Sequence, residues 1–362
     1  TLCDYFRHRF DRKTEFVASV FMVPSYFGYI AAQLVALGLI LNVVTDIPIW
    51  QGIVASSIVV TLYTFIGGMW AISVTDFIQS VIIIMGLGVL AYILSSKAGG
   101  VMNVIDAAPS ATFKFFPDAD AVSIVSYLAA WSVLGLGSIP SQDVFQRAMS
   151  SGSSAIAVRS CYYAAGLYLT IAMLPLFISL CVKYLYPESV NGDTQLTLPT
   201  MVLQHAAMPV QILFFGSLLS AIMSTTSSAM LAPAAVVTEN ILKPMMKDKP
   251  TDLHFLMTTR LMLLVVSIIA TIMACLKSDI YELVGGASIL SLVSLFIPMA
   301  LGMYWKRSSA TGAILAMTTG IGAWLYFEYD PLDIPALVPA VLVSLMAMII
   351  GSLLWPTKKF QD

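Results

Sequence analysis

Charged residues are scarce in this sequence. Asp, Glu, Lys and Arg make up 10% of its 362 residues, whereas hydrophobic residues make up 59%. Soluble domains carry about 25% charged residues, and the mean hydropathy of this chain is +0.88. The composition therefore excludes an ordinary soluble domain and predicts a polytopic membrane protein whose partner is the lipid bilayer. We expect no nucleic-acid partner.

Patterns for metal centres and nucleotide hydrolysis are also missing. The four cysteines show no CxxC or metal-ligand spacing. Three of them lie in or beside apolar segments, where a free cysteine behaves as a small hydrophobe. No GxxxxGK[ST] sequence occurs, which argues against an ATP-driven pump encoded in this chain. We expect neither an enzyme nor an organic cofactor.

The sequence has no Met at position 1. It opens on the polar segment Thr-Leu-Cys-Asp-Tyr-Phe-Arg-His-Arg-Phe, which looks cytoplasmic rather than like a signal peptide. We therefore expect the chain to begin within a larger protein.

Long apolar segments dominate what is present. A membrane-crossing helix needs roughly 20 apolar residues, and about ten segments meet or approach this length. They lie at about 16–44, 47–66, 70–96, 122–140, 156–186, 205–238, 255–276, 280–305, 310–327 and 335–355. We predict an all-α membrane protein with about ten transmembrane helices.

Basic residues predict the orientation of these helices. If the segments alternate in direction, one side receives Arg7, Arg9, Arg12, Lys13, Arg147, Arg159, Lys243, Lys247, Lys249, Arg260, Lys306, Arg307, Lys358 and Lys359. The other side receives Lys97, Lys114, Lys183 and Lys277. Cytoplasmic loops carry the excess of Lys and Arg. We expect both ends of the chain and loop Lys243–Thr251 in the cytoplasm, with loop Pro187–Pro199 outside.

One apolar run, Met208–Val237, contains the hydroxyl-rich and uncharged stretch Gly216–Ala229. The residues at i, i+3, i+4 and i+7 of a helix share one face, and here they are Ala221, Ser224, Thr225 and Ser228. Small and hydroxylated residues let membrane helices pack closely. Hydroxyls and a freed carbonyl are also hard oxygen ligands for a cation. The stretch alone is compatible with both interpretations.

Other polar residues are placed where a cavity could form. Asp76 and Gln79 lie one helical turn apart, and an ionisable residue within a membrane segment is functional by default; the alternative is a solvated place at the interface. Gly135, Gly137 and Pro140 predict a break before the polar cluster Gln142–Arg147, although an ordinary helix end would show the same residues. Tyr26, Tyr29 and Gln33 have helical spacing and could line a cavity or simply pack.

Three motifs in this order resemble those of the sodium:solute symporter family. They are Gly67-Gly68-x-x-Ala71-x-x-x-Thr75-Asp76-x-x-Gln79, Gln142-x-x-x-Gln146-Arg147 and Ser220-Ala221-x-Met223-Ser224-Thr225. Members of that family carry sugars, proline, sialic acid, choline, vitamins or anions together with sodium. The resemblance implies sodium-coupled symport by alternating access in the plasma membrane (the cell inner membrane of a bacterium), with Na⁺ as the coupling ion.

The resemblance also implies an architecture. The family's core is a pair of inverted five-helix repeats of the leucine-transporter type. One transmembrane domain would then fill residues 1–362, with a cytoplasmic link at 1–15 and the rest of the first repeat at 16–96. The second repeat would be 122–305, and 310–355 would be additional helices. The first core helices would be absent from this chain.

Site residues follow from the same resemblance. Ala221 (through its carbonyl), Ser224 and Thr225 correspond to the main sodium site. A possible second sodium site consists of Asp76, Ser227 and Ser228. The residues expected along the solute path are Tyr29, Gln33, Gln142 and Gln146.

The solute implied is small and organic, with a choline-like compound first and an amino or organic acid second. A quaternary ammonium ion needs an aromatic cage. This chain has Ser141 where choline-type members have Trp, which puts the cage in doubt. A competing interpretation is a transporter-like membrane sensor that binds solute and signals to a cytoplasmic partner.

Overall fold

A computed structural model describes residues 1–187, 194–246 and 251–356, apart from the side chains at 68–71 and 194. Parts of the predicted loops Pro187–Pro199 and Lys243–Thr251 lie outside the described residues. So do the four lysines Lys247, Lys249, Lys358 and Lys359.

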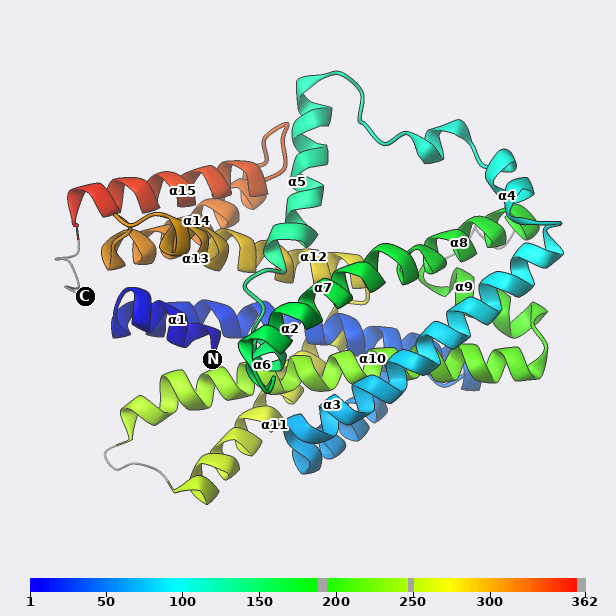
Figure 1. Cartoon of the computed structure of the whole chain (residues 1–362), viewed down its shortest axis with the longest axis horizontal. Helices are drawn as coiled ribbons and strands as arrows, with labels where there is room; N and C mark the ends of the chain where they lie inside the picture. The colour runs from blue at the N-terminus through cyan, green and yellow to red at the C-terminus, as the bar shows by residue number, and fades with distance from the viewer. Residues whose placement is uncertain (188–193, 247–250, 357–362) are drawn as a thin grey trace.

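Helices make up most of the described chain (Figure 1). They are α1 (Leu2–Arg9), α2 (Arg12–Thr45), α3 (Ile49–Lys97), α4 (Val101–Ala107), η1 (Ser110–Phe113), α5 (Ala121–Gly137), α6 (Gln142–Met149), α7 (Ser154–Ile171), α8 (Met173–Leu185), α9 (Thr194–His205), α10 (Met208–Val236), η3 (Val237–Leu242), η4 (Lys243–Met245), α11 (Asp252–Leu276), α12 (Ile280–Ser291), η5 (Leu292–Phe296), α13 (Ile297–Tyr304), α14 (Ala310–Tyr329) and α15 (Leu337–Leu354). Within the described ranges, ten helical segments are long and apolar enough to cross a membrane. The predicted fold class and the predicted spans are confirmed.

Helix α2 is the centre of the bundle. It begins where the Asp11 side chain accepts the Thr14 N–H, and it packs against α3, α10, α11 and α12. Its residues Met22, Ile30 and Leu34 are fully buried in the main hydrophobic core. Its packing against four other helices, and not its apolar character, identifies α2 as central, because a helix that faces lipid is also apolar on all sides.

Helix α3 contains two of the predicted spans. A straight helix of 49 residues would be about 74 Å long. Yet Ile53, near its start, meets Gly38 of α2, and Leu90, near its end, shares a core cluster with Ile40 of α2. The chain therefore reverses direction within α3 (Figure 1). The segments Ile49–Gly67 and Ile72–Lys97 act as separate crossings, as the sequence predicts.

Three prolines account for three interruptions of the helices. Proline cannot donate to the carbonyl four residues earlier and its ring clashes with it. Pro140 follows the end of α5, Pro175 follows the junction of α7 and α8 at Ala172, and Pro298 follows η5. The break at Pro140 confirms the predicted interruption. Helix α5 continues through Gly135, however, so the prediction that Gly135 marks the break is wrong.

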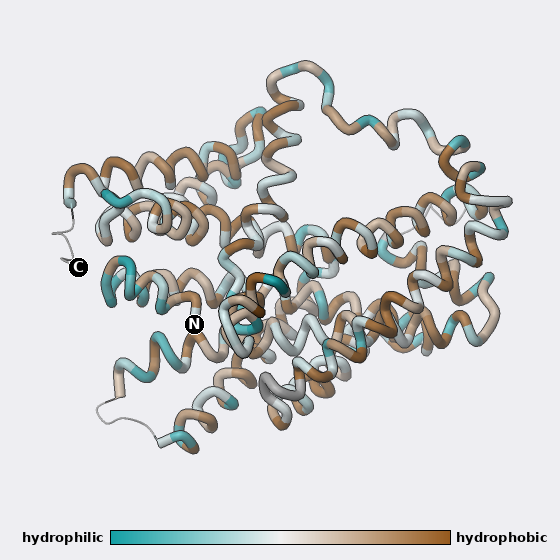
Figure 2. Tube along the Cα trace, in the orientation of Figure 1, coloured by the Kyte–Doolittle hydropathy of each residue, from teal (hydrophilic) through white to brown (hydrophobic). Residues whose placement is uncertain are grey.

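Polar contacts gather at one end of the bundle. Arg9 donates to the carbonyls of Gly302 (2.7 Å) and Trp305 (3.1 Å) at the end of α13, and Arg12 donates to the Pro244 carbonyl (3.1 Å). Figure 2 shows hydrophilic residues along α1 and at the neighbouring ends of α10 and α11. The basic segments around Arg9, Arg12 and Lys243, which were predicted to share one side, lie at the same end of the molecule.

The last two helices form a tightly packed pair. The Cα atom of Gly312 in α14 would lie 2.7 Å from a Cβ atom added to Gly351 in α15, so the two backbones touch where neither residue has a side chain. The pair packs against η5 and α2 beside the cavity-forming helices.

Candidate ion and solute site

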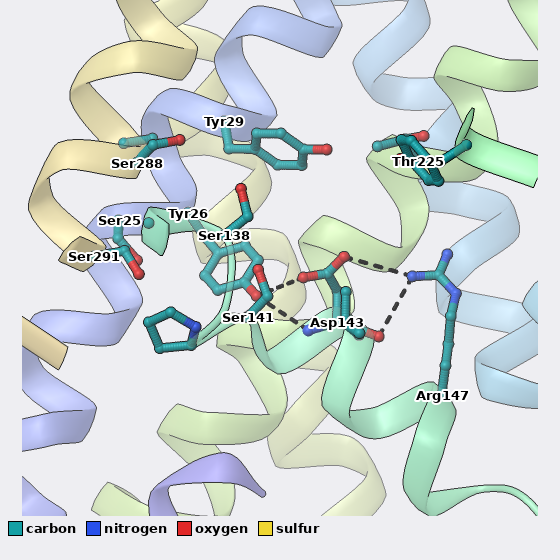
Figure 3. Close-up of a pocket in the computed structure, with 15 residues that line it drawn as sticks. Ser25, Tyr26, Tyr29, Ser138, Ser141, Asp143, Arg147, Thr225, Ser288 and Ser291 are labelled. Atoms are coloured by element: carbon teal, nitrogen blue, oxygen red, sulfur yellow. Dashed lines mark hydrogen bonds and ion pairs between the residues drawn. The ribbon is translucent and has the colours of Figure 1, made fainter. Parts of the chain in front are cut away.

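A cavity of about 390 Å³ opens beside the break between α5 and α6 (Figure 3). Its lining combines hydroxyl groups, tyrosine rings and two charged side chains. The lining residues are Ser25, Tyr26 and Tyr29 of α2; Gly137, Ser138, Pro140 and Ser141 of the break; Asp143, Val144 and Arg147 of α6; Tyr168 of α7; Thr225 of α10; and Ala287, Ser288 and Ser291 of α12. Five helices and a helix break thus meet around one polar space.

A close backbone contact holds the break against α12. A Cβ atom added to Gly137 would lie 2.5 Å from the backbone oxygen of Ser288. Glycine is therefore required where α5 ends, whereas a Cβ at Gly135 would meet nothing within 4 Å. The contact fixes one wall of the cavity, because Gly137 and Ser288 both line it.

Asp143 is held in place by hydrogen bonds to a buried tyrosine. The Tyr26 hydroxyl donates to Asp143 Oδ1 (2.7 Å) and accepts the Asp143 backbone N–H (3.0 Å). Tyr26 is 5% exposed, and Asp143 lies in the first turn of α6 just after Ser141. A carboxylate in the first helical turn interacts favourably with the helix dipole. The two hydrogen bonds hold this carboxylate at the cavity wall.

Arg147 lies between two carboxylates. Its Nη2 and Nε atoms are 2.9 and 3.2 Å from Asp76 Oδ2, and its Nη1 atom is 3.5 Å from Asp143 Oδ2. The exposed fractions of the side chains are 35% for Arg147, 21% for Asp76 and 14% for Asp143. The shorter contacts assign the guanidinium mainly to Asp76. Arg147 therefore links α3 to the wall of the cavity.

The second oxygen of Asp76 connects to the hydroxyl-rich helix α10. Ser224 Oγ donates to Asp76 Oδ1, so both carboxylate oxygens of Asp76 accept hydrogen bonds from protein groups. Gln79, one turn along the same helix, has a buried Oε1 that accepts no hydrogen bond from the described residues. Of the two residues predicted to form a polar helix face, Asp76 is therefore hydrogen-bonded to neighbouring helices, whereas in the described part of the chain the buried Oε1 of Gln79 is not.

The hydroxyls of α10 fall into two groups. Thr225 lines the cavity, and its Oγ1 donates to the Ala221 carbonyl (3.0 Å). Ser227 and Ser228 are fully buried; Ser227 Oγ donates to the Ser224 carbonyl (2.9 Å). Thr225 thus belongs to the cavity wall, whereas Ser227 and Ser228 belong to the buried face of α10. Ala221, Ser224 and Thr225, the residues predicted for the main sodium site, lie within about one turn of this helix.

The three residues predicted for a second sodium site, Asp76, Ser227 and Ser228, do not contact one another in this way. Among the described residues, Asp76 has no hydrogen bond to Ser227 or Ser228 and bonds to Ser224 and Arg147 instead. Ser228 is approached by Gln146, whose Nε2 lies 3.4 Å from its hydroxyl and 3.5 Å from its carbonyl.

Of the four residues predicted for the solute path, one lines the cavity and three do not. Tyr29 lines the cavity, whereas Gln33 and Gln142 do not. Gln142 is 2% exposed, and its Oε1 accepts the Leu2 backbone N–H (2.6 Å), so it joins α6 to α1. Gln146 contacts α10 rather than the cavity.

Sequence reasoning missed Asp143, Tyr168 and the serines of α12. The i, i+4 spacing of Asp143 and Arg147 and the i, i+3 spacing of Ser288 and Ser291 are signals of shared helix faces that could have identified four of the lining residues. Tyr168 carries no comparable signal, because its exposed helix approaches the cavity through tertiary packing alone.

Comparison with known proteins gives a consistent result. Residues 1–320 match the description "Sodium:solute symporter family". The human high affinity choline transporter 1 is 26% identical over 338 residues, which cover 89% of this chain and 57% of that protein. The osmoregulated proline transporter OpuE of Bacillus subtilis (strain 168) is 27% identical over 370 residues, covering 98% of this chain and 74% of that protein. The chain thus spans little more than half the length of the choline transporter.

A solved structure shares the fold. It is the substrate-bound, outward-open state of a Na⁺-coupled sialic acid symporter, which superimposes with a TM-score of 0.82 at 21% identity. The match covers 99% of this chain and 78% of that one. Ten helices in the described ranges are apolar enough to cross a membrane, and the relatives, bacterial ones included, are membrane transporters, so the chain is a multi-pass plasma-membrane protein.

Proposed function

Because the chain belongs to the sodium:solute symporter family, we propose that the full-length protein moves a small organic solute across the plasma membrane together with sodium. The observation that carries this proposal is the polar cavity between α2, α6, α10 and α12, whose wall includes Thr225 of the hydroxyl-rich helix. Ion and solute would then bind next to each other, where each could raise the affinity for the other.

The main sodium site would use the Ala221 carbonyl and the hydroxyls of Ser224 and Thr225. Hard cations prefer oxygen ligands, and these three groups lie on one turn of α10. Thr225 Oγ1 already lies 3.0 Å from the Ala221 oxygen. None of the three carries a formal charge, so the affinity for sodium would depend on each oxygen.

A second sodium ion would require a rearrangement. Asp76, Ser227 and Ser228 are the proposed ligands, but Arg147 and Ser224 occupy both carboxylate oxygens of Asp76. A cation at Asp76 would therefore compete with the guanidinium of Arg147. The proposal is that this second site forms when Arg147 moves away.

The solute we propose first is choline-like, and the second is an amino or organic acid. Tyr29 and Tyr168 place aromatic rings at the cavity, and tyrosine rings attract cations through their faces. Relatives named as choline and proline transporters are compatible with both.

Transport by the reconstituted full-length protein tests the proposal. Vesicles receive an inward sodium gradient, and uptake of radiolabelled choline and proline is measured. We expect accumulation of at least one solute that is lost when potassium replaces sodium outside. Accumulation that is equal in potassium would contradict sodium coupling. Binding without any accumulation would favour a sensor instead.

A further inference from the structure

We propose that Asp143 selects the solute by its charge: its carboxylate binds an ammonium group of the transported compound. This inference rests on the proposed transport function and names a recognition residue within it. Asp143 and Arg147 are the two charged residues among those that line the cavity in the described chain. The chemistry of the solute therefore depends on which of these two charges remains available.

The contact distances answer that question. Arg147 makes two contacts with Asp76, at 2.9 and 3.2 Å, whereas its nearest approach to the Asp143 carboxylate is 3.5 Å. Two carboxylates thus share one guanidinium, and the ion pair with Asp76 neutralises most of the positive charge of Arg147. One negative charge is left over, and it lies at Asp143 on the cavity wall.

The remaining partner of Asp143 is neutral. The Tyr26 hydroxyl donates to Oδ1 at 2.7 Å, which holds the carboxylate in place without cancelling its charge. Tyr26 is buried, and it also accepts the Asp143 N–H. A binding group whose rotamer is locked by buried neighbours is pre-organised for its ligand. Oδ2, by contrast, has only the 3.5 Å contact to Arg147 Nη1 among the described residues, and Asp143 lines the cavity.

The walls around Asp143 suit an ammonium group. Figure 3 shows the ring of Tyr29 above the Asp143 carboxylate, with Ser138 beside it and Thr225 toward Arg147. Tyr168 completes the lining from α7. Ring faces and a carboxylate attract the same positive charge. A cation or the ammonium end of a zwitterion would therefore bind here, and a neutral compound of equal shape would lose both attractions.

A matched pair of ligands tests the proposal. Choline and its uncharged isostere 3,3-dimethylbutan-1-ol have nearly the same shape. Their dissociation constants are measured for the purified full-length protein in saturating sodium. We expect the wild type to prefer choline by about tenfold or more, because an ammonium between a carboxylate and aromatic rings gains both attractions. In Asp143→Asn the preference should vanish, through weaker choline binding alone.

Two controls separate recognition from structure. Asp143→Glu keeps the charge and should retain a preference for choline, and it serves if Asp143→Asn does not fold. Asp118→Asn makes the same chemical change at an exposed loop residue paired with Lys114 and should change neither constant. The dissociation constant for sodium in the absence of choline should be equal in wild type and Asp143→Asn, because Asp143 is not a proposed sodium ligand.

Clear results would overturn the inference. They are a wild type that binds both ligands equally or binds neither, and an Asp143→Asn variant that keeps the preference or weakens both ligands in parallel. Sodium-driven uptake of a solute without an ammonium group would contradict this inference and leave the proposed function intact. Charge-selective choline binding that does not depend on sodium, without sodium-driven uptake, would contradict the proposed function and leave this inference intact.

Discussion

Two groups of carboxylates lie among the helices, and they differ in what surrounds them. The first, here called the end network, joins Asp4 of α1 and Glu15 of α2 to Asn240 of η3. Asn240 Nδ2 donates to Glu15 Oε1 (2.8 Å) and to Asp4 Oδ1 (2.9 Å). Glu15 and Asn240 are 2% and 3% exposed.

The second group, here called the cavity cluster, contains Asp76, Asp143, Arg147 and Ser224. Its side chains are partly exposed, and two of them line a cavity. A buried carboxylate must be paired or hydrogen-bonded within the protein. In the end network Asn240 satisfies that need for the buried Glu15, whereas the side chain of Asp4 is 35% exposed. In the cavity cluster Asp143 has one short neutral partner and faces open space, so a ligand can complete the pairing.

The comparison also explains why burial alone does not identify function. Glu15 is the more buried carboxylate, yet its environment leaves no room for a ligand. The neighbouring Cys3 illustrates the same closed surroundings, because burial raises the pKa of its thiol to about 12. An adjoining cavity and a carboxylate in excess of the available positive charge distinguish the cavity cluster from the end network.

The largest effect should come from breaking the end network. Asn240→Leu removes the amide that Glu15 and Asp4 share and leaves Glu15 with a 3.9 Å contact to Arg7 Nε. Removing one partner of a buried charge costs about 3–5 kcal/mol. We expect a much lower melting temperature or little folded protein in detergent. Asn103→Leu also removes two amide hydrogen bonds, to the carbonyls of Ala98 and Gly99, but leaves no buried carboxylate behind, so it is the control and should have the smaller effect. An unchanged melting temperature for Asn240→Leu would show that the network is not structural.

A smaller effect should come from the wall beside the cavity cluster. Gly137→Ala places a Cβ atom 2.5 Å from the Ser288 backbone oxygen, so α5 and α12 must separate. Overpacking of this kind costs about 1–3 kcal/mol. We expect reduced solute affinity together with a lower melting temperature. Gly135→Ala, which meets nothing within 4 Å, should leave both unchanged; equal behaviour of the two variants would argue against a wall built on this contact.

Asp76→Asn tests whether the cavity cluster binds an ion. If Asp76 serves a second sodium ion, uptake by the full-length protein should show a Hill coefficient above one, and the variant should lower it towards one. An amide keeps the shape of the side chain but loses the charge. If Asp76 is structural, like Glu15, the variant should reduce the amount of folded protein and leave the coefficient unchanged. A coefficient of one in the wild type would falsify the second-ion proposal.

The smallest effects should come from single hydroxyls of α10. Loss of one oxygen ligand should raise the sodium concentration for half-maximal uptake by about two- to tenfold in Ser224→Ala and in Thr225→Ala. Thr225→Ala removes a ligand of the proposed main site and leaves the hydrogen bonds of Asp76 intact, whereas Ser224→Ala also removes a donor to Asp76. Leu218→Ala is the packing control. Unchanged sodium dependence in Thr225→Ala would mean that this hydroxyl serves packing.

The helices themselves could be predicted because their signals are local. Apolar length determines which segments can cross a bilayer, and the ten predicted spans correspond to the ten observed ones. Pro140 predicted the break before α6 because proline acts on the carbonyl four residues before it. Gly135 was misjudged, since a glycine inside a helix ends it only when the surroundings require it.

The partners of the polar residues could not be predicted. Sequence spacing places Asp76 beside Gln79, but whether its carboxylate contacts Ser224, Ser227 or Arg147 depends on how α3, α6 and α10 pack. Gln142 and Gln146 are both polar residues of the same segment, and the sequence predicts both for the solute path. In the structure Gln142 instead accepts the Leu2 N–H of α1. Such contacts join residues more than 70 positions apart, and a single sequence holds no record of them.

The sequence by itself determined that this chain is a multi-span membrane protein with a hydroxyl-rich helix face, because composition and periodicity are properties of neighbouring residues. The tertiary structure alone decided which carboxylate is closed in and which faces a cavity. That distinction arises where α2, α6, α10 and α12 meet: Tyr26 positions Asp143, Asp76 holds Arg147, and Gly137 allows α5 to touch α12. Charge availability is a property of three-dimensional contacts, so it follows from the packing of distant helices.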